Sequence, residues 1–252
     1  PTRARAALFV FTAACAALPS PATGTASAPA PRSEINDLQY GGKGSDPLPL
    51  GKTTVRLRDA EIKLVQIPAQ DGWQVSAEYQ LVHEGPAPAT VNVLLPEDLC
   101  PPKRRCSPTA GLLQDLGARF GDALLTATQA PPDVVAPFAE HPGAGHQYAL
   151  TLPPRKPTRL SLEYRFDQSH GSRYSGVFVT SAAGRFAGKV ERVRYTIEVP
   201  QPMLYVLHPR GLRLAEFQER PTEEGAGAVV RLVLIGENLL QRSDLAVIFS
   251  GD

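Results

Sequence analysis

The sequence predicts an all-β protein made of two antiparallel β-sandwich domains of the immunoglobulin-like type. Three observations favour this class. Apolar and polar residues alternate with period two in many short runs, clusters of turn residues separate these runs, and proline makes up 25 of the 252 residues, about twice its usual share. Side chains two apart on a strand lie on the same face, so each run predicts a half-buried strand, and the prolines disfavour long helices.

Residues 1–28 are predicted to be a secretory signal peptide. Arg3 and Arg5 form a short basic start, residues 6–18 form an uncharged, mostly apolar run, and Ala26-Ser27-Ala28 matches a small-x-small cleavage pattern. The apolar run is shorter than the roughly 20 residues that cross a bilayer as a helix. We therefore expect a secreted or periplasmic protein with no membrane span after the signal peptide is removed.

The cysteines fit an exported protein. Cys100 and Cys106 enclose a short loop, and in an oxidising compartment they are expected to form a structural disulfide. Zinc or redox chemistry would need a more closely spaced pair or further ligands nearby, and the sequence has neither there. Cys15 lies inside the signal segment, where the small residues before it leave lipid attachment as an alternative.

The first domain is expected over residues 53–167, after an extended segment at residues 29–52. Asp71-Gly72 favours a hairpin turn between its first two strands. Trp73, the only tryptophan, heads an alternating run and is expected to pack in the core. The strands predicted in this domain are Val55–Leu64, Trp73–Leu81, Val91–Leu95, Tyr148–Leu152 and Leu160–Phe166.

An insertion is expected over residues 97–147, because the period-two pattern stops there. Ser107-Pro108 is a suitable start for one short helix. The apolar residues that recur at helical spacing after it are Leu112, Leu113, Leu116, Phe120 and Leu124. Long insertions in compact domains often carry function, so the sequence places a binding surface in this insertion or at exposed strand edges.

The second domain is expected over residues 172–252, with the boundary near Gln168 to Gly171. Its runs are rich in β-branched and aromatic residues and are separated by proline and glycine. One large sandwich built from the strands of both domains is the alternative. The strands predicted in the second domain are Tyr174–Thr180, Val190–Val199, Leu204–Leu207, Leu212–Phe217, Val229–Ile235 and Leu245–Phe249.

Several short motifs carry a resemblance. They are Val91-Asn92-Val93-Leu94-Leu95-Pro96, Leu152-Pro153-Pro154, Tyr174 to Thr180 followed by Gly184 to Gly188, and Ser243-Asp244-Leu245. With these motifs the chain resembles secreted bacterial β-sandwich proteins of unknown function and, more faintly, the domain that precedes von Willebrand type A domains. The resemblance implies architecture and export and no chemistry.

No strong catalytic, nucleotide-binding or metal-binding motif is present in the sequence, and no cofactor is expected. The net charge of +1 gives no reason to expect nucleic acid as a partner. The best remaining group of ligands is Glu140, His141 and His146, in the loop after the predicted helix. His83, His170 and His208 stand singly in turn-like contexts and are expected to be structural or solvated.

The sequence therefore favours an exported, non-enzymatic binding or structural module of the cell envelope, whose partner is a protein or a polysaccharide. The alternative is a metal-assisted hydrolase that uses Glu140, His141 and His146. The sequence leaves the choice between enzyme and non-enzyme open and favours the latter.

Overall fold

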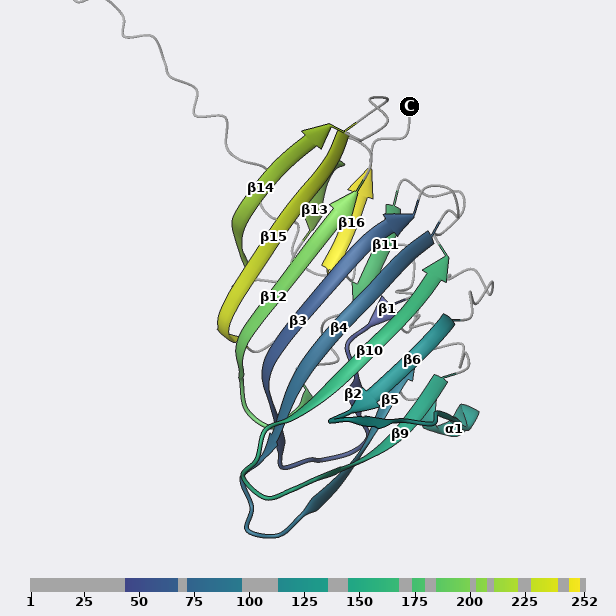
Figure 1. Cartoon of the computed structure of the whole chain (residues 1–252), viewed down its shortest axis with the longest axis vertical. Coiled ribbons are helices and arrows are strands. Elements are labelled where there is room, and N and C mark those ends of the chain that lie inside the picture. The colour runs from purple at the N-terminus through teal and green to yellow at the C-terminus, as the bar shows by residue number, and fades with distance from the viewer. Residues whose placement is uncertain are drawn as a thin grey trace, which may run out of the picture. The chain divides into compact units, whose positions relative to one another are not determined.

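The computed structural model describes residues 44–67, 72–96, 113–135, 145–167, 174–179, 185–199, 203–207, 211–221, 228–239 and 245–249. These residues are nearly all in strands, with one short helix, α1 (Pro132–Val135), so the predicted all-β class is confirmed. Figure 1 shows one broad sheet in front and shorter strands behind it. Within these ranges, no helix has the length and apolarity needed to cross a membrane.

Within the described residues, the largest sheet has eight strands. In spatial order they are β14 (Arg213–Pro221), β15 (Ala228–Leu239), β12 (Val190–Val199), β3 (Val55–Ile67), β4 (Gly72–His83), β10 (Thr158–Asp167), β6 (Gln114–Phe120) and β7 (Ala123–Leu124). Every long strand in it falls on one of the predicted alternating runs except β6, which the sequence predicted as helix.

Two four-stranded sheets accompany the large one. The first has the order β1 (Gly44–Ser45), β11 (Tyr174–Val179), β16 (Leu245–Phe249) and β13 (Met203–Leu207). The second has the order β2 (Leu48–Pro49), β5 (Ala89–Pro96), β9 (Gly145–Leu152) and β8 (Thr128–Gln129). The segment of residues 44–49 thus adds an edge strand to each of the two small sheets.

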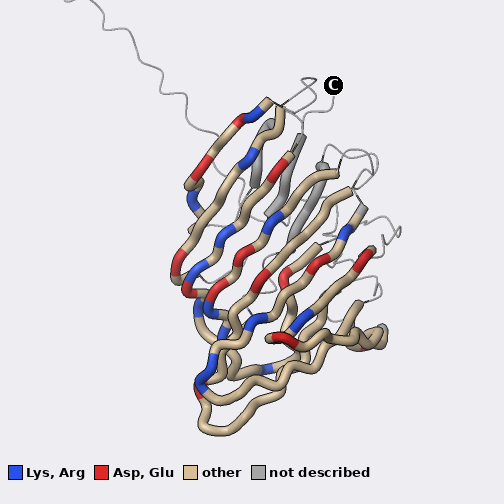
Figure 2. Tube along the Cα trace, viewed as in Figure 1, with Lys and Arg blue, Asp and Glu red and all other residues tan. Residues whose placement is uncertain are grey.

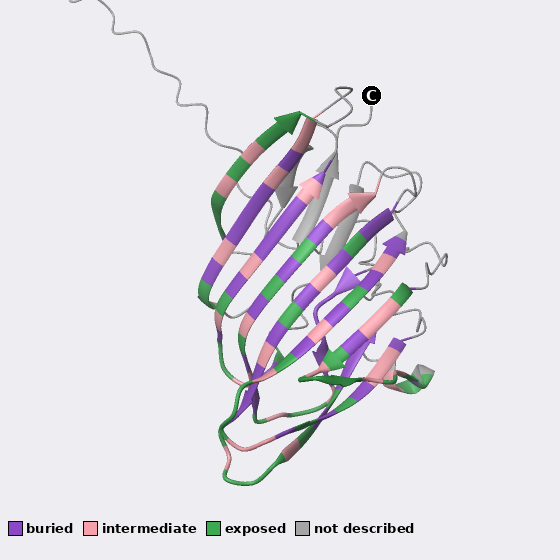
Figure 3. Cartoon of the chain, viewed as in Figure 1, coloured by how far each residue is buried: buried purple, intermediate pink, exposed green. Residues whose placement is uncertain are grey.

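The hydrophobic core lies between the large sheet and the sheet of β5 and β9. Alternate residues of β3, β4, β10, β12 and β15 are buried in one cluster with alternate residues of β5 and β9. The purple and green segments that alternate along the strands of Figure 3 follow this pattern. Trp73 is 1% exposed, which confirms its predicted core position. We call the buried side of the large sheet its inner face and the opposite side its outer face.

The predicted division into two antiparallel sandwich domains is not confirmed. β3, from the expected first domain, is hydrogen-bonded to β12, from the expected second domain, and the two strands are parallel. Residues from both expected domains also share the core cluster, as the alternative of one large sandwich predicts. Alternation identifies strand residues and their buried side, but it does not identify the neighbouring strand. The expected boundary at residues 168–171 lies outside the described residues.

The predicted helix over residues 112–124 is wrong where the structure describes this segment, at residues 113–124. Gln114–Phe120 is strand β6, which pairs with β10, and it turns back through a tight hairpin into β7. Gly121 lies at the turn with φ of 57°, a left-handed conformation that glycine adopts without strain. Gly117 and Gly121 weaken a helix by about 1 kcal/mol each, whereas pairing with β10 gives the backbone hydrogen bonds that a strand needs.

The expected insertion at residues 97–147 is built into the sandwich where the structure describes it. β6 and β7 extend the large sheet, and β8 extends the sheet of β5 and β9. Leu113 and Ala118 are part of the core cluster, and Leu116, Phe120, Leu125 and Ala127 pack against it. The described part of this segment therefore closes one side of the sandwich.

Candidate functional site

The outer face of the large sheet carries charged residues of both signs in ordered rows. Figure 2 shows blue and red segments alternating along its strands. Neighbouring strands place opposite charges together, as in Lys63–Glu198 at 3.0 Å and Arg56–Glu191 at 3.0 Å. Further ion pairs join Arg56–Glu84, Arg165–Asp115, Arg231–Glu198 and Arg231–Glu216. These pairs neutralise many of the charges on the outer face. Each exposed pair contributes only about 0–1 kcal/mol to stability.

A groove of about 380 Å³ crosses this face over β4, β3, β12 and β15. Four carboxylates and two guanidinium groups line it, together with Gln80, Ile235 and the small residues of the strands. The charged residues are Asp59, Glu61, Glu78, Glu237, Arg192 and Arg194. No aromatic side chain is among the described residues that line the groove, and these residues offer charge and hydrogen bonds.

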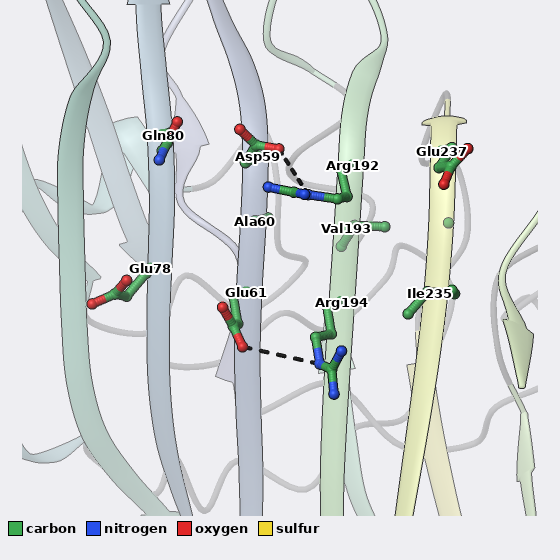
Figure 4. Close-up of a pocket in the computed structure, with 11 residues that line it drawn as sticks. Asp59, Ala60, Glu61, Glu78, Gln80, Arg192, Val193, Arg194, Ile235 and Glu237 are labelled. Atoms are coloured by element: carbon green, nitrogen blue, oxygen red, sulfur yellow. Dashed lines mark ion pairs between the residues drawn. The ribbon is translucent and has the colours of Figure 1, made fainter. Parts of the chain in front are cut away.

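The register of the strands sets the arrangement of charges in the groove. Asp59 lies next to Arg192, with 3.1 Å between carboxylate and guanidinium, and Glu61 lies next to Arg194, with 4.0 Å between them. Both pairs are drawn as dashed lines in Figure 4. Glu61 also lies directly opposite Glu78 on β4. Like charges in this position repel each other across a sheet.

The charged side chains of the groove are open to solvent, except for that of Asp59. The side chains of Glu61, Arg192 and Glu78 are 70%, 71% and 53% exposed. Glu78 forms an ion pair with a residue outside the groove, Arg159 of β10, at 3.4 Å. The described lining is therefore a solvated surface with four carboxylates and two guanidinium groups, an excess of two acidic groups.

A second polar cluster lies in the interior and consists of Asp46, Tyr79, Tyr164 and Tyr195. Asp46, between β1 and β2, is fully buried. Its carboxylate accepts hydrogen bonds from the hydroxyls of Tyr79 at 2.7 Å and Tyr195 at 3.2 Å. The Tyr164 hydroxyl accepts from the backbone N–H of Ser45 at 3.2 Å and donates to the Ser45 carbonyl at 3.1 Å. This cluster attaches the segment of residues 44–49 to three strands of the large sheet.

Burial dominates the electrostatics of the tyrosine cluster. It raises the pKa of Tyr79 well above its usual value of about 10, and the negative charge of Asp46 raises it further. Burial likewise raises the pKa of Tyr164, against a smaller lowering by its hydrogen bond to Ser45. Both hydroxyls stay protonated at neutral pH and act as hydrogen-bond donors. The cluster lies on the inner face of the sheet and the groove on its outer face, so a molecule bound in the groove does not contact the cluster.

The residues that the sequence proposed for a metal site are mostly outside the described part of the chain. Glu140 and His141 lie outside it, while His146 is on β9, next to Leu95 of β5 and Gln129 of β8. Among the described residues, no group of three or more His, Cys, Asp or Glu side chains is arranged to hold a metal ion. Cys15, Cys100 and Cys106 are outside the described residues too, so the disulfide and the lipid anchor stay predictions.

His83 fits its expected structural role. Its side chain is 9% exposed, its Nδ1 lies 3.1 Å from the hydroxyl of Thr54, and its carbonyl accepts the N–H of Arg155. The ring packs so closely on Gly85 that a Cβ there would lie 2.3 Å from it. His170 and His208 lie outside the described residues.

Sequence reasoning missed both the groove and Asp46. The groove depends on the order of four strands, which period-two patterns do not contain. Asp46 stands in a segment without alternation. The one available signal was indirect: Tyr79, Tyr164 and Tyr195 occupy apolar positions of predicted strands, and buried hydroxyls need hydrogen-bond partners.

Comparison with known proteins supports the fold alone. No family model matches the chain, and no curated protein matches it. Among solved structures, the chain is similar to a protein from Legionella pneumophila that is provisionally described as nutrient binding, with a TM-score of 0.58, 12% identity, and coverage of 84% of this chain and 72% of that one. An M1 zinc metallopeptidase from Deinococcus radiodurans matches with a TM-score of 0.33 and 11% identity, over 74% of this chain and 43% of the enzyme. That second likeness is too low to carry an argument.

Proposed function

We propose that this chain is a non-enzymatic binding module and that the groove on its outer face binds a basic segment of a partner protein. The observation that carries this proposal is the position of Glu61 and Glu78, directly opposite each other in a groove lined by four carboxylates and two guanidinium groups. A lysine or arginine side chain placed between the two carboxylates would relieve their repulsion. The gain is modest, because exposed pairs contribute about 0–1 kcal/mol each.

The lining of the groove favours a protein over a polysaccharide as the partner. Its excess of acidic groups attracts basic side chains, while its described lining contains no aromatic ring against which a sugar could pack. The fold similarity to a protein provisionally described as nutrient binding is compatible with a binding role.

The proposal includes export. The basic start, apolar run and small-x-small pattern of residues 1–28 support a signal peptide, and the partner would then be an envelope or extracellular protein. Intact-mass measurement of the chain recovered from its native host tests this part: loss of about the first 28 residues supports export, and a full-length intracellular product contradicts it.

Binding to a fluorescent hexalysine peptide tests the groove. We expect its fluorescence anisotropy to rise with protein concentration at low salt and to fall with added salt, because exposed charges are screened within about 10 Å at 0.1 M. The double variant Glu61→Gln with Glu78→Gln is expected to bind roughly tenfold more weakly, since it removes two partly exposed charges.

Glu163→Gln is the matched control, because Glu163 is an exposed carboxylate on β10 of the same sheet but not in the groove. It should bind hexalysine as the wild type does. Equal weakening by both variants would mean that only overall charge matters, and the groove proposal would be wrong. Binding of neutral oligosaccharides in place of hexalysine would favour the polysaccharide alternative.

A further inference from the structure

A second interaction surface lies at the edge of the large sheet, on β14. This strand is hydrogen-bonded to β15 on one side, and among the described strands it has no neighbour on the other. It is exposed along most of its length, as the green and pink segments of β14 in Figure 3 show. A bare edge strand presents unpaired N–H and carbonyl groups to any chain that can add a strand.

The edge strand β14 also carries exposed apolar side chains. Phe217 and Leu214 are 56% and 52% exposed, and they pair with the buried Leu232 and Leu234 of β15. They therefore stand on the inner face of the sheet and extend the core toward the edge. Large exposed apolar residues beside an open strand edge are typical of surfaces that bind another chain.

The charges of β14 identify the chain that fits it. The pairing with β15 is regular from Glu216 to Pro221, after a register shift between Leu214 and Glu216. Within that stretch Glu216, Gln218 and Arg220 share the outer face, as their β15 partners Val233, Arg231 and Val229 indicate. Glu216 and Arg220 thus flank Gln218 at equal distance with opposite charge.

We propose that two copies of this chain associate through antiparallel pairing of their β14 strands about a two-fold axis at Gln218. This pairing sets Glu216 of each copy opposite Arg220 of the other, so that one axis gives two identical ion pairs. On the inner face, Phe217 comes opposite Glu219 and diagonal to Phe217 of the second copy, within reach of an aromatic side chain. The two eight-stranded sheets become one continuous sheet.

Among the described residues, the contacts of Glu216 and Arg220 within the chain leave both charges able to face a second copy. Arg220 donates a hydrogen bond to Gln218 of its own strand, and Glu216 lies 3.5 Å from Arg231, in a pair whose side chains are 32% and 29% exposed. Both contacts lie along or across the outer face rather than over the open edge. Neither prevents the second copy from approaching the strand.

Sedimentation velocity of the 252-residue chain over a wide concentration range tests this proposal. The wild type is expected to show a reversible monomer–dimer equilibrium. Each single charge reversal, Glu216→Arg or Arg220→Glu, places like charges opposite each other twice and should weaken the dimer by about tenfold or more. Glu163→Arg, a reversal on β10 away from the edge, is the control and should leave the equilibrium unchanged.

Mixing the two single variants gives the decisive measurement. The two substituted positions then face each other with opposite charges, exchanged relative to the wild type, and the unchanged Arg220 of one variant faces the unchanged Glu216 of the other. The mixture should therefore form heterodimers while each variant alone stays monomeric. Fluorescence of Trp73 during urea unfolding verifies that both variants are folded. A wild type that is monomeric throughout, a dimer that both reversals leave intact, or a mixture that does not associate would each overturn the proposal.

Discussion

Replacing Asp46 with alanine tests whether the interior cluster holds the segment of residues 44–49 to the large sheet. The carboxylate accepts hydrogen bonds from the hydroxyls of Tyr79 and Tyr195, and all three residues are fully buried. Alanine leaves both hydroxyls without this acceptor, and a buried polar group that loses its partner costs about 1–3 kcal/mol. We therefore expect the variant to lose about 2–6 kcal/mol, a large part of the ~5–15 kcal/mol that stabilises a typical domain.

Urea unfolding followed by fluorescence measures this loss. The chain has one tryptophan, Trp73, which is buried on β4, so the signal reports on the large sheet. Two further variants, Asp46→Asn and Ser45→Ala, serve as comparisons. Asp46→Asn keeps the size of the side chain and one carbonyl acceptor and should lose less than alanine does.

Ser45→Ala is the matched control, because Ser45 is the buried neighbour of Asp46 and its hydroxyl has no hydrogen-bond partner in the described part of the chain. Removing an unsatisfied buried hydroxyl should leave the stability unchanged or raise it slightly. If Asp46→Ala shifts the urea midpoint no more than Ser45→Ala does, the carboxylate does not stabilise the fold and the reasoning fails.

Two further predictions concern the core. The pKa values of Tyr79, Tyr148 and Tyr164 are all raised in the folded state, that of Tyr148 to about 12 by burial. Their contribution to stability is therefore complete below pH 10 and is lost as the pH rises above 10. The free energy of unfolding falls by up to about 4 kcal/mol per pH unit while the three phenols ionise only in the unfolded chain. An unchanged urea midpoint between pH 10 and pH 11 would contradict this prediction. Gly236→Ala places a Cβ 2.2 Å from Leu239 and 2.8 Å from Leu212 and should cost about 1–3 kcal/mol. Gly117→Ala meets nothing closer than 4.0 Å and should be nearly neutral, so equal thermal midpoints for these two glycine variants would refute the packing argument.

The sequence predicted most strands of the large sheet correctly because the alternation of apolar and polar residues reflects which face of a strand is buried. The runs at residues 73–81 and 190–199 identify β4 and β12, and their buried side, because burial on one face of a strand directly selects apolar residues at every second position. The sequence pattern does not reveal that β12 pairs in parallel with β3, because a strand buries the same face beside a parallel or an antiparallel neighbour. At residues 112–124, leucine spacing suggested a helix, but the glycines and the hydrogen bonds offered by β10 favour a strand.

The groove charges are available to a partner because of their place in the sheet. Elsewhere on the outer face, opposite charges lie next to each other, and pairs such as Lys63–Glu198 at 3.0 Å satisfy both groups. At the groove, the antiparallel register of β3 and β4 places Glu61 against Glu78, so each carboxylate must turn to an arginine on its other side, at 4.0 Å and 3.4 Å. The core excludes a shift of β4 by one residue, because this shift would turn Trp73 and Tyr79 out of the core and Tyr79 away from Asp46. The buried cluster and the exposed groove are thus two consequences of one strand register, and the repulsion between Glu61 and Glu78 persists because the core fixes it.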